Sequence, residues 1–233
     1  MWHYAPINEF APDGHLKQVD YASKAAELGN SVVGIVGKSC IVIASMKKED
    51  NPLLVSNSAS SIFQIDDGII AAFSGLPGDA GPLANGARLK VSKAKFEYGE
   101  TPSLKTVSQF LIEKMQHATM MSNTRPFGVS IMLGGVVDRR ELMKITADGT
   151  CSGCKAGAIG KRAVEITTYL EENFNEELLT NENLVIQLAI KSLRQIAVFS
   201  GKDVEVAVLT GQGRYANYRT LTQPEKQTII EAL

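Results

Sequence analysis

The sequence predicts an α+β protein, a four-layer αββα sandwich in which two antiparallel sheets lie face to face between pairs of helices. Strand-like runs come in adjacent pairs joined by short turns and do not alternate with helices, which argues against a doubly wound parallel sheet. Each long helical pattern is apolar on one face only. Two packed sheets with helices outside would bury all of these apolar faces, so we expect a single domain over residues 1–233.

The first expected element is a helix from Leu16 to Leu28. Its apolar residues recur at spacings of three and four, which is the period of one helix face. Pro12-Asp13-Gly14 predicts a turn ahead of this helix, and Gly29 is a suitable stop at its C-terminal end. Residues 1–15 therefore form an N-terminal tail that leads into the helix.

Turn and cap residues separate the later elements. Asp66-Asp67-Gly68 lies between two apolar runs, which is a strong hairpin signal, and Thr180 or Asn181 can cap the helix that follows. The expected elements are strands 31–36 and 40–44, strands 62–65 and 69–73, helices 80–94 and 104–118, strands 129–137 and 141–146, one strand 152–158, helices 161–173 and 182–199, and strand 204–209. These elements form a core over 31–210, which includes a polar stretch at 47–60, and a C-terminal segment follows over 211–233.

Composition narrows the classes of function. Lys and Arg total 24 and Asp and Glu total 25, and this balance argues against general nucleic-acid binding, which needs a basic surface. No apolar run approaches the ~18 residues of a membrane span, and the first residues lack the basic and apolar regions of a secretory signal. Three cysteines without such a signal fit a reducing compartment. We expect a soluble intracellular protein that binds neither nucleic acid nor membrane.

Cys151 and Cys154 have the spacing of a CxxC motif. A zinc site needs a second pair of ligands, which Cys40 and three dispersed histidines do not supply. A redox pair is expected at a strand-to-helix turn, whereas these cysteines lie in or beside a predicted strand. The default interpretation is two small buried residues, with no metal and no cofactor. A stand-alone thiol or metal protein that uses Cys151 and Cys154 stays open as an alternative.

Several segments resemble motifs of the α-type subunits of the proteasome core particle. Residues 10–22, FAPDGHLKQVDYA, are similar to the family signature F-S-P-x-G-R-L-x-Q-V-E-Y-A. Residues 72–80, AFSGLPGDA, are similar to the segment that opens the family's first long helix. RPFGVS at 125–130 and AIG at 158–160 match two further motifs, and all four occur in the family's order. Among the α types, TMMSNTRPFG at 119–128 resembles type 7.

The resemblance implies the fold of N-terminal-nucleophile hydrolases and a place in the seven-membered outer ring of a barrel-shaped protease. Catalytic relatives use an N-terminal threonine, activated with the help of an aspartate and a lysine. The nucleophile position falls at Asn30, the aspartate at Met46, the lysine at Ser61 and a supporting serine at Lys161. Asparagine offers no alkoxide and methionine carries no charge, so the resemblance implies a chain that is not an enzyme. An active threonine peptidase of the same fold stays open as an alternative.

The resemblance also implies a role at the gate of the ring. The family's gate cluster corresponds to His3, Tyr4, Pro12 and Tyr21, and only Pro12 and Tyr21 keep the family's residue type. Only two residues precede His3, which is short for a tail that plugs a pore. We therefore expect a minor gating role, with neighbouring subunits supplying the plug.

A pocket for the C-terminal tails of activators corresponds to Ser61 and Gly75. Serine replaces the pocket lysine, and it has no positive charge to offer a tail carboxylate, so we expect weak docking there. The implied partners are two neighbouring α subunits, the β subunits beneath, and the tails of a regulatory particle or another activator. The resemblance thus implies a hetero-oligomer of cytoplasm and nucleus that supports ubiquitin-dependent protein degradation through assembly, entry control and activator docking.

Overall fold

The computed structural model describes residues 9–47, 60–121, 123–175 and 179–232. Its strands are β1 (Val32–Val36), β2 (Cys40–Met46), β3 (Ile62–Asp66), β4 (Ile69–Gly75), β5 (Val129–Gly135), β6 (Glu141–Ile145), β7 (Cys151–Cys154), β8 (Ala156–Ile159), β9 (Val204–Thr210) and β10 (Asn217–Thr220). Its helices are α1 (Lys17–Glu27), α2 (Pro77–Tyr98), α3 (Leu104–Met120), α4 (Ala163–Asn173), α5 (Glu182–Arg194), the 3-10 turn η1 (Gly213–Tyr215) and α6 (Gln223–Glu231).

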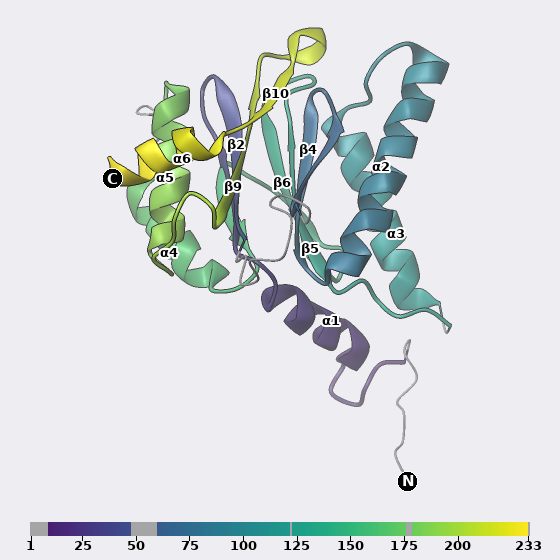
Figure 1. The fold of residues 1–233 in the computed structure, drawn as a ribbon. Coiled ribbons are helices and arrows are strands. Elements are labelled where there is room, and N and C mark those ends of the chain that lie inside the picture. The colour runs from purple at the N-terminus through teal and green to yellow at the C-terminus, as the bar shows by residue number, and fades with distance from the viewer. Residues whose placement is uncertain (1–8, 48–59, 122, 176–178, 233) are drawn as a thin grey trace, which may run out of the picture.

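The strands form two five-stranded antiparallel sheets. The first has the order β10-β9-β2-β1-β8 and the second the order β3-β4-β5-β6-β7. The two sheets face each other, with α2 and α3 on one outer side and α4, α5 and α6 on the other (Figure 1). This confirms the four-layer α+β sandwich predicted from the sequence.

Apolar side chains fill each interface between the layers. Leu193 of α5 belongs to one buried cluster with Val42 of the first sheet, and Leu111 of α3 belongs to another with Leu133 of the second sheet. A third cluster, which includes Met132, lies between the sheets. Both faces of β2 and β5 are covered, which explains why their sequences are nearly continuous apolar runs rather than alternating ones.

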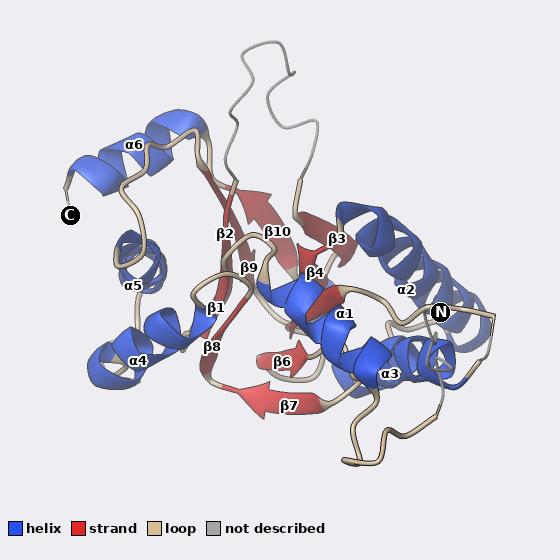
Figure 2. Ribbon diagram, turned by 90° about the horizontal axis from the view of Figure 1, so that it is seen from below, coloured by secondary structure: helices blue, strands red, loops and turns tan. Residues whose placement is uncertain are grey.

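Helix α1 lies outside the four layers, against the ends of β4 and β5 (Figure 2). Its predicted span is confirmed to within one residue at each end. Its small buried residues Ala22 and Ala26 cluster with Ala147 in the turn between β6 and β7. These alanines let the helix backbone approach the sheet closely, and the other residues of α1 are half-buried or exposed.

The prediction of one strand over 152–158 is wrong. The segment is two strands, because β7 pairs with β6 in the second sheet and β8 pairs with β1 in the first. The chain crosses between the sheets at Lys155, whose carbonyl accepts a hydrogen bond from the Val36 amide at 2.8 Å. The residues on either side of Lys155 are nearly all small, and they carry no signal of a change of partner strand, so periodicity alone does not reveal this crossing.

The prediction of a helix that continues to Phe199 is also wrong, since α5 ends at Arg194. Phe199 nevertheless packs into the same cluster as α5, from a loop, so the apolar pattern outlasts the helix. Asn181 is the N-terminal cap of α5, although its side chain makes no capping hydrogen bond. The C-terminal segment contains β10 and α6, which were not predicted. Thr222 and Glu225 form a capping box at the start of α6, a signal that is visible in the sequence.

The polar stretch around Glu49-Asp50-Asn51-Pro52 lies outside the described residues. Within the described parts of the chain, every helix is too short or too polar to cross a membrane.

Asp79 ties the start of α2 to the segment that enters β5. Its side chain is 7% exposed and accepts two hydrogen bonds from the Arg125 guanidinium, at 2.6 and 2.7 Å. The backbone amide of Gly128 donates a third, at 2.9 Å. The Arg125 hydrogen bonds lower the pKa of Asp79, with a further contribution from Gly128. Arg125 and Gly128 of the RPFG motif therefore hold the segment before β5 against the start of α2.

We predict that Asp79→Asn lowers the free energy of unfolding by about 2 kcal/mol at neutral pH, as expected for hydrogen bonds to a charged group. Because folding lowers the pKa of Asp79, its stabilising effect is present above the unfolded pKa near 4 and is lost as pH falls through the folded pKa. Urea denaturation at pH 7 and pH 3 measures both effects. Glu97→Gln, on an exposed position of the same helix, is the control and should change little.

Candidate functional site

The position implied for a nucleophile is occupied by Asn30, between α1 and β1. The Asn30 side-chain amide donates a hydrogen bond to the Ser61 hydroxyl at 3.2 Å. The structure therefore brings together two of the predicted site residues, which are 31 positions apart in the chain. Both groups are neutral, and the residue between α1 and β1 is joined by peptide bonds on both sides, so Asn30 offers neither an ionisable hydroxyl nor a free α-amino group.

Backbone packing around Asn30 is unusually close. A Cβ atom on Gly29 would lie 1.9 Å from the backbone nitrogen of Gly75, and a Cβ on Gly160 would lie 2.2 Å from the carbonyl oxygen of Asn30. Gly75 and Gly160 also have positive φ angles, of 127° and 85°. The Ser74 hydroxyl lies within hydrogen-bond distance of the carbonyl oxygens of Asn30, at 2.8 Å, and Ala26, at 3.2 Å. The end of α1 is thereby held directly on the second sheet.

Glu205 completes the link between the sheets and was not predicted as a site residue. It lies on β9 of the first sheet, and its carboxylate accepts hydrogen bonds from the Ser60 hydroxyl at 2.5 Å and the Ser61 amide at 3.2 Å, at the entry to β3. The signal for it in the sequence is a single acidic residue within the apolar run of β9. Its role here is to position the segment that carries Ser61.

The other two degenerate positions do not join this cluster through their side chains. Met46 packs against the apolar cluster between the first sheet and its helices. The Lys161 side chain is exposed, while its backbone carbonyl accepts from the Ser31 hydroxyl at 2.6 Å and its amide donates to the Gly29 carbonyl at 3.0 Å. Lys161 thus helps to hold the site by its backbone, and Met46 is a core residue.

Asn30, Ser61 and Gly75 line a cavity of about 60 Å³. Sites that enclose ligands typically measure about 300–1,000 Å³, so this cavity is too small to enclose a segment of polypeptide. The two residues predicted for the activator pocket, Ser61 and Gly75, therefore share one small hollow with the degenerate nucleophile position. At this hollow the Ser61 hydroxyl accepts a hydrogen bond from the Asn30 side-chain amide.

Of the predicted gate residues, Pro12 and Tyr21 do not line this hollow. Pro12 lies in an exposed turn before α1, where Gly14 takes a positive φ of 82°. Tyr21 lies on α1 and is 56% exposed. His3 and Tyr4 lie outside the described residues.

Cys151 and Cys154 are half-buried rather than fully buried as the default interpretation expected. They are three residues apart in β7, so their side chains leave opposite faces of the sheet. Cys151 packs toward the α2–α3 layer and Cys154 toward the space between the sheets. Burial raises the pKa of both thiols, and that of Cys40 to about 11. In the described residues no three His, Cys, Asp or Glu side chains lie close enough together to hold a metal ion.

Comparison with known sequences decides the family. A sequence model described as "Proteasome subunit" matches residues 26–209. The chain belongs to the proteasome subunit family. The match begins inside α1 and ends in β9, so it covers the whole site around Asn30 and both sheets except β10.

Three similar proteins carry the names of α-type members of this family. The chain is 31% identical to "Proteasome subunit alpha type-7" of Caenorhabditis elegans over 229 residues, which cover 97% of this chain and 90% of the relative. It is 33% identical to "Proteasome subunit alpha type-7-like" of Macaca fascicularis and to "Proteasome subunit alpha type-8" of Mus musculus, each over 205 residues that cover 87% of this chain and 82% of the relative. The predicted resemblance to α-type subunits is confirmed.

We predict that Gly29→Ala destabilises the chain by about 3 kcal/mol, near the upper end for an overpacked site, because the new methyl group collides with the backbone of Gly75. Urea denaturation measures this loss. The matched control is Gly78→Ala in the first turn of α2, where a Cβ meets open space and alanine stabilises a helix by up to ~1 kcal/mol. Equal stability of the two variants would contradict the role given to the Gly29–Gly75 contact.

Proposed function

We propose that this chain is a non-catalytic structural and gating subunit in the outer α-ring of a proteasome core particle. The observation that carries the proposal is Asn30, which stands at the position implied for the nucleophile, lies in mid-chain between α1 and β1, and is hydrogen-bonded to Ser61. The names of its relatives as α-type subunits support the same conclusion. Its contribution to ubiquitin-dependent degradation is then architectural, through ring assembly and control of substrate entry.

The chemistry at the site supports the absence of peptidase activity. Hydrolysis by an N-terminal nucleophile needs a hydroxyl or thiol and a nearby base to accept its proton. Asn30 supplies neither, Ser61 replaces the lysine, and Met46 faces another layer of the fold. The continuous chain from α1 into β1 also leaves no terminal amine beside the hollow.

Exposed apolar side chains support assembly with other subunits. Tyr21 and Leu28 of the α1 region are 56% and 78% exposed, and Leu89 and Phe96 of α2 are 56% and 93% exposed. Each pair is seven residues apart, so each marks one stripe of a helix surface. Apolar stripes on two separate helices are typical of a subunit that is covered by different neighbours. We propose two α neighbours in the ring and β subunits beneath, in a hetero-oligomer of cytoplasm and nucleus.

The proposed regulatory role is limited by two features. Ser61 offers no positive charge to a tail carboxylate, and the hollow that it lines is only about 60 Å³. We therefore propose that an activator tail gains less at this pocket than at one with a lysine. Pro12 and Tyr21 sit at the α1 end of the molecule, and we propose that they support a gate whose plug comes from neighbouring subunits.

The proposal predicts that tagged chain, purified under native conditions from its own cells, runs within a large particle together with other α- and β-type chains. Native gel electrophoresis followed by mass spectrometry of the excised band makes the measurement. A chain that runs alone near 25.1 kDa would contradict the proposed function. Crosslinks within the particle then identify its two neighbours.

We also predict that Asn30→Thr remains inactive as a peptidase, because the new hydroxyl sits in mid-chain and lacks the free α-amino group that a terminal threonine carries. The isolated variant should release no more fluorophore from a fluorogenic peptide than parent chain from the same preparation. Asn30→Ala is the control for contaminating proteases. Hydrolysis by the threonine variant that is absent from the alanine variant would show that the site retains latent catalytic capacity.

A further inference from the structure

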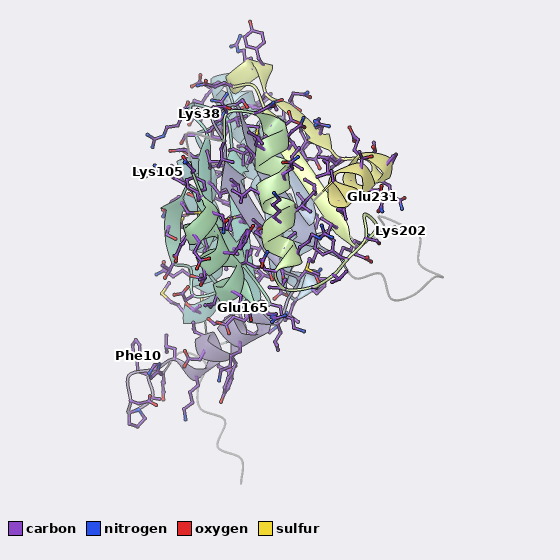
Figure 3. The ribbon with its side chains drawn as sticks, turned by 90° about the vertical axis from the view of Figure 1, so that its left-hand side faces the viewer. Phe10, Lys38, Lys105, Glu165, Lys202 and Glu231 are labelled. Carbon is purple, nitrogen blue, oxygen red and sulfur yellow. The ribbon has the colours of Figure 1, made fainter. Side chains whose placement is uncertain are left out.

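The outer surface of α4 and α5 carries two adjoining hollows, of about 220 and 410 Å³. Tyr169 of α4 and Lys191 of α5 line both hollows, so together they form one groove along the two helices. Figure 3 faces this side of the molecule, with Glu165 of α4 labelled near one end of the helical layer. The groove lies on the opposite side of the sandwich from α2 and α3 (Figure 1).

One end of the groove combines apolar side chains with the amide side chains of Asn173, Asn175 and Gln187. Leu184 and Leu188 of α5 are four residues apart and lie on one side of the helix, with Tyr169 of α4 also lining this hollow. Leu188 is buried and Leu184 is 43% exposed, which leaves a leucine side chain partly open to water at the groove wall. This end can take an aliphatic or aromatic side chain.

The other end of the groove is cationic. Lys191 and Arg194 lie three residues apart in the last turn of α5. The Arg194 guanidinium is held by a hydrogen bond to the Ile230 carbonyl at 3.1 Å. Within the described ranges neither side chain forms an ion pair. The negative end of the helix dipole stabilises both positive charges, because they lie in the last turn of α5. On α4, the carboxylate of Glu165 is already paired with Arg162 at 2.9 Å. A carboxylate from another molecule can therefore be held between Lys191 and Arg194.

We propose that this groove docks a short segment of a partner protein, in which an apolar side chain is followed closely by carboxylates. The apolar side chain fills the end beside Leu184 and Tyr169, and the carboxylates pair with Lys191 and Arg194. Charge complementarity argues for an acidic segment, and the leucine-lined end argues for a polypeptide over a nucleic acid. This interaction goes beyond the proposed function, because it uses a helical layer that is separate from the hollow at Asn30.

The test is the binding of a fluorescein-labelled Leu-Leu-Glu-Glu peptide to the purified full chain, measured by fluorescence anisotropy. We expect the peptide to bind, and its glutamine counterpart, Leu-Leu-Gln-Gln, to bind at least tenfold more weakly. Lys191→Glu should weaken the binding of the acidic peptide at least tenfold, and Leu184→Ser at least threefold. Lys202→Glu is the matched control, since Lys202 is an exposed lysine in the loop before β9 and should leave binding unchanged.

The variants separate the possible outcomes. Equal binding of the two peptides, or no effect of Lys191→Glu, overturns the proposal. Sensitivity to Lys191→Glu without sensitivity to Leu184→Ser indicates simple ionic adsorption and also overturns it. A carbodiimide crosslink from Lys191 to an acidic residue of a partner, in native complexes, supports it when Lys202 gives no such link. These results do not depend on assembly into a large particle, so this proposal and the proposed function fail separately.

Discussion

The contact between the backbones of Gly29 and Gly75 determines how the first helix, the first strand and the second sheet meet. Gly29 follows the C-cap of α1, Gly75 is the last residue of β4, and neither position has room for a side chain. The contact brings the carbonyls of Ala26 and Asn30 within hydrogen-bond distance of Ser74, and it seats Asn30 next to Ser61. The placement of α1, the closure of the hollow and the identity of the neighbours of Asn30 all depend on this approach of two glycines.

The close contact of Gly29 with Gly75 also leaves neither a chain end nor open space at the start of β1. A terminal nucleophile needs a chain end at the start of β1 and open space in front of it. Here the chain continues into α1, and the hydrogen bonds of Asn30 and Glu205 to the segment that enters β3 bridge the two sheets at this point. The neutral pair of Asn30 and Ser61 and the docking of α1 are therefore parts of one arrangement, in which the two sheets are joined at the start of β1.

The sequence predicts most of the fold because turns and helix faces leave local signals. Asp66-Asp67-Gly68 locates a hairpin without knowledge of the rest of the chain. The crossing at Lys155 leaves no such signal, because partner strands are chosen by packing over long separations in sequence. The resemblance to a known family predicted Asn30 and Ser61 as site residues. It did not predict Ser74 and Glu205, because their roles depend on tertiary contacts that leave no local signal. The capping box of α6, by contrast, is a local signal that was available.

The distribution of charge separates internal joints from outward surfaces. Arg125 and Asp79 neutralise each other where α2 meets β5, and Lys95 pairs with Asp66 at 2.5 Å where α2 ends beside β3. Pairing at such joints is expected, since a charge taken from water without a partner is costly. Lys191 and Arg194 are different, because they sit side by side on an accessible helix end next to leucine. An acidic segment with an apolar side chain can pair with both cations and cover the leucine beside them. This complementarity is the physical basis for assigning a binding role to this groove.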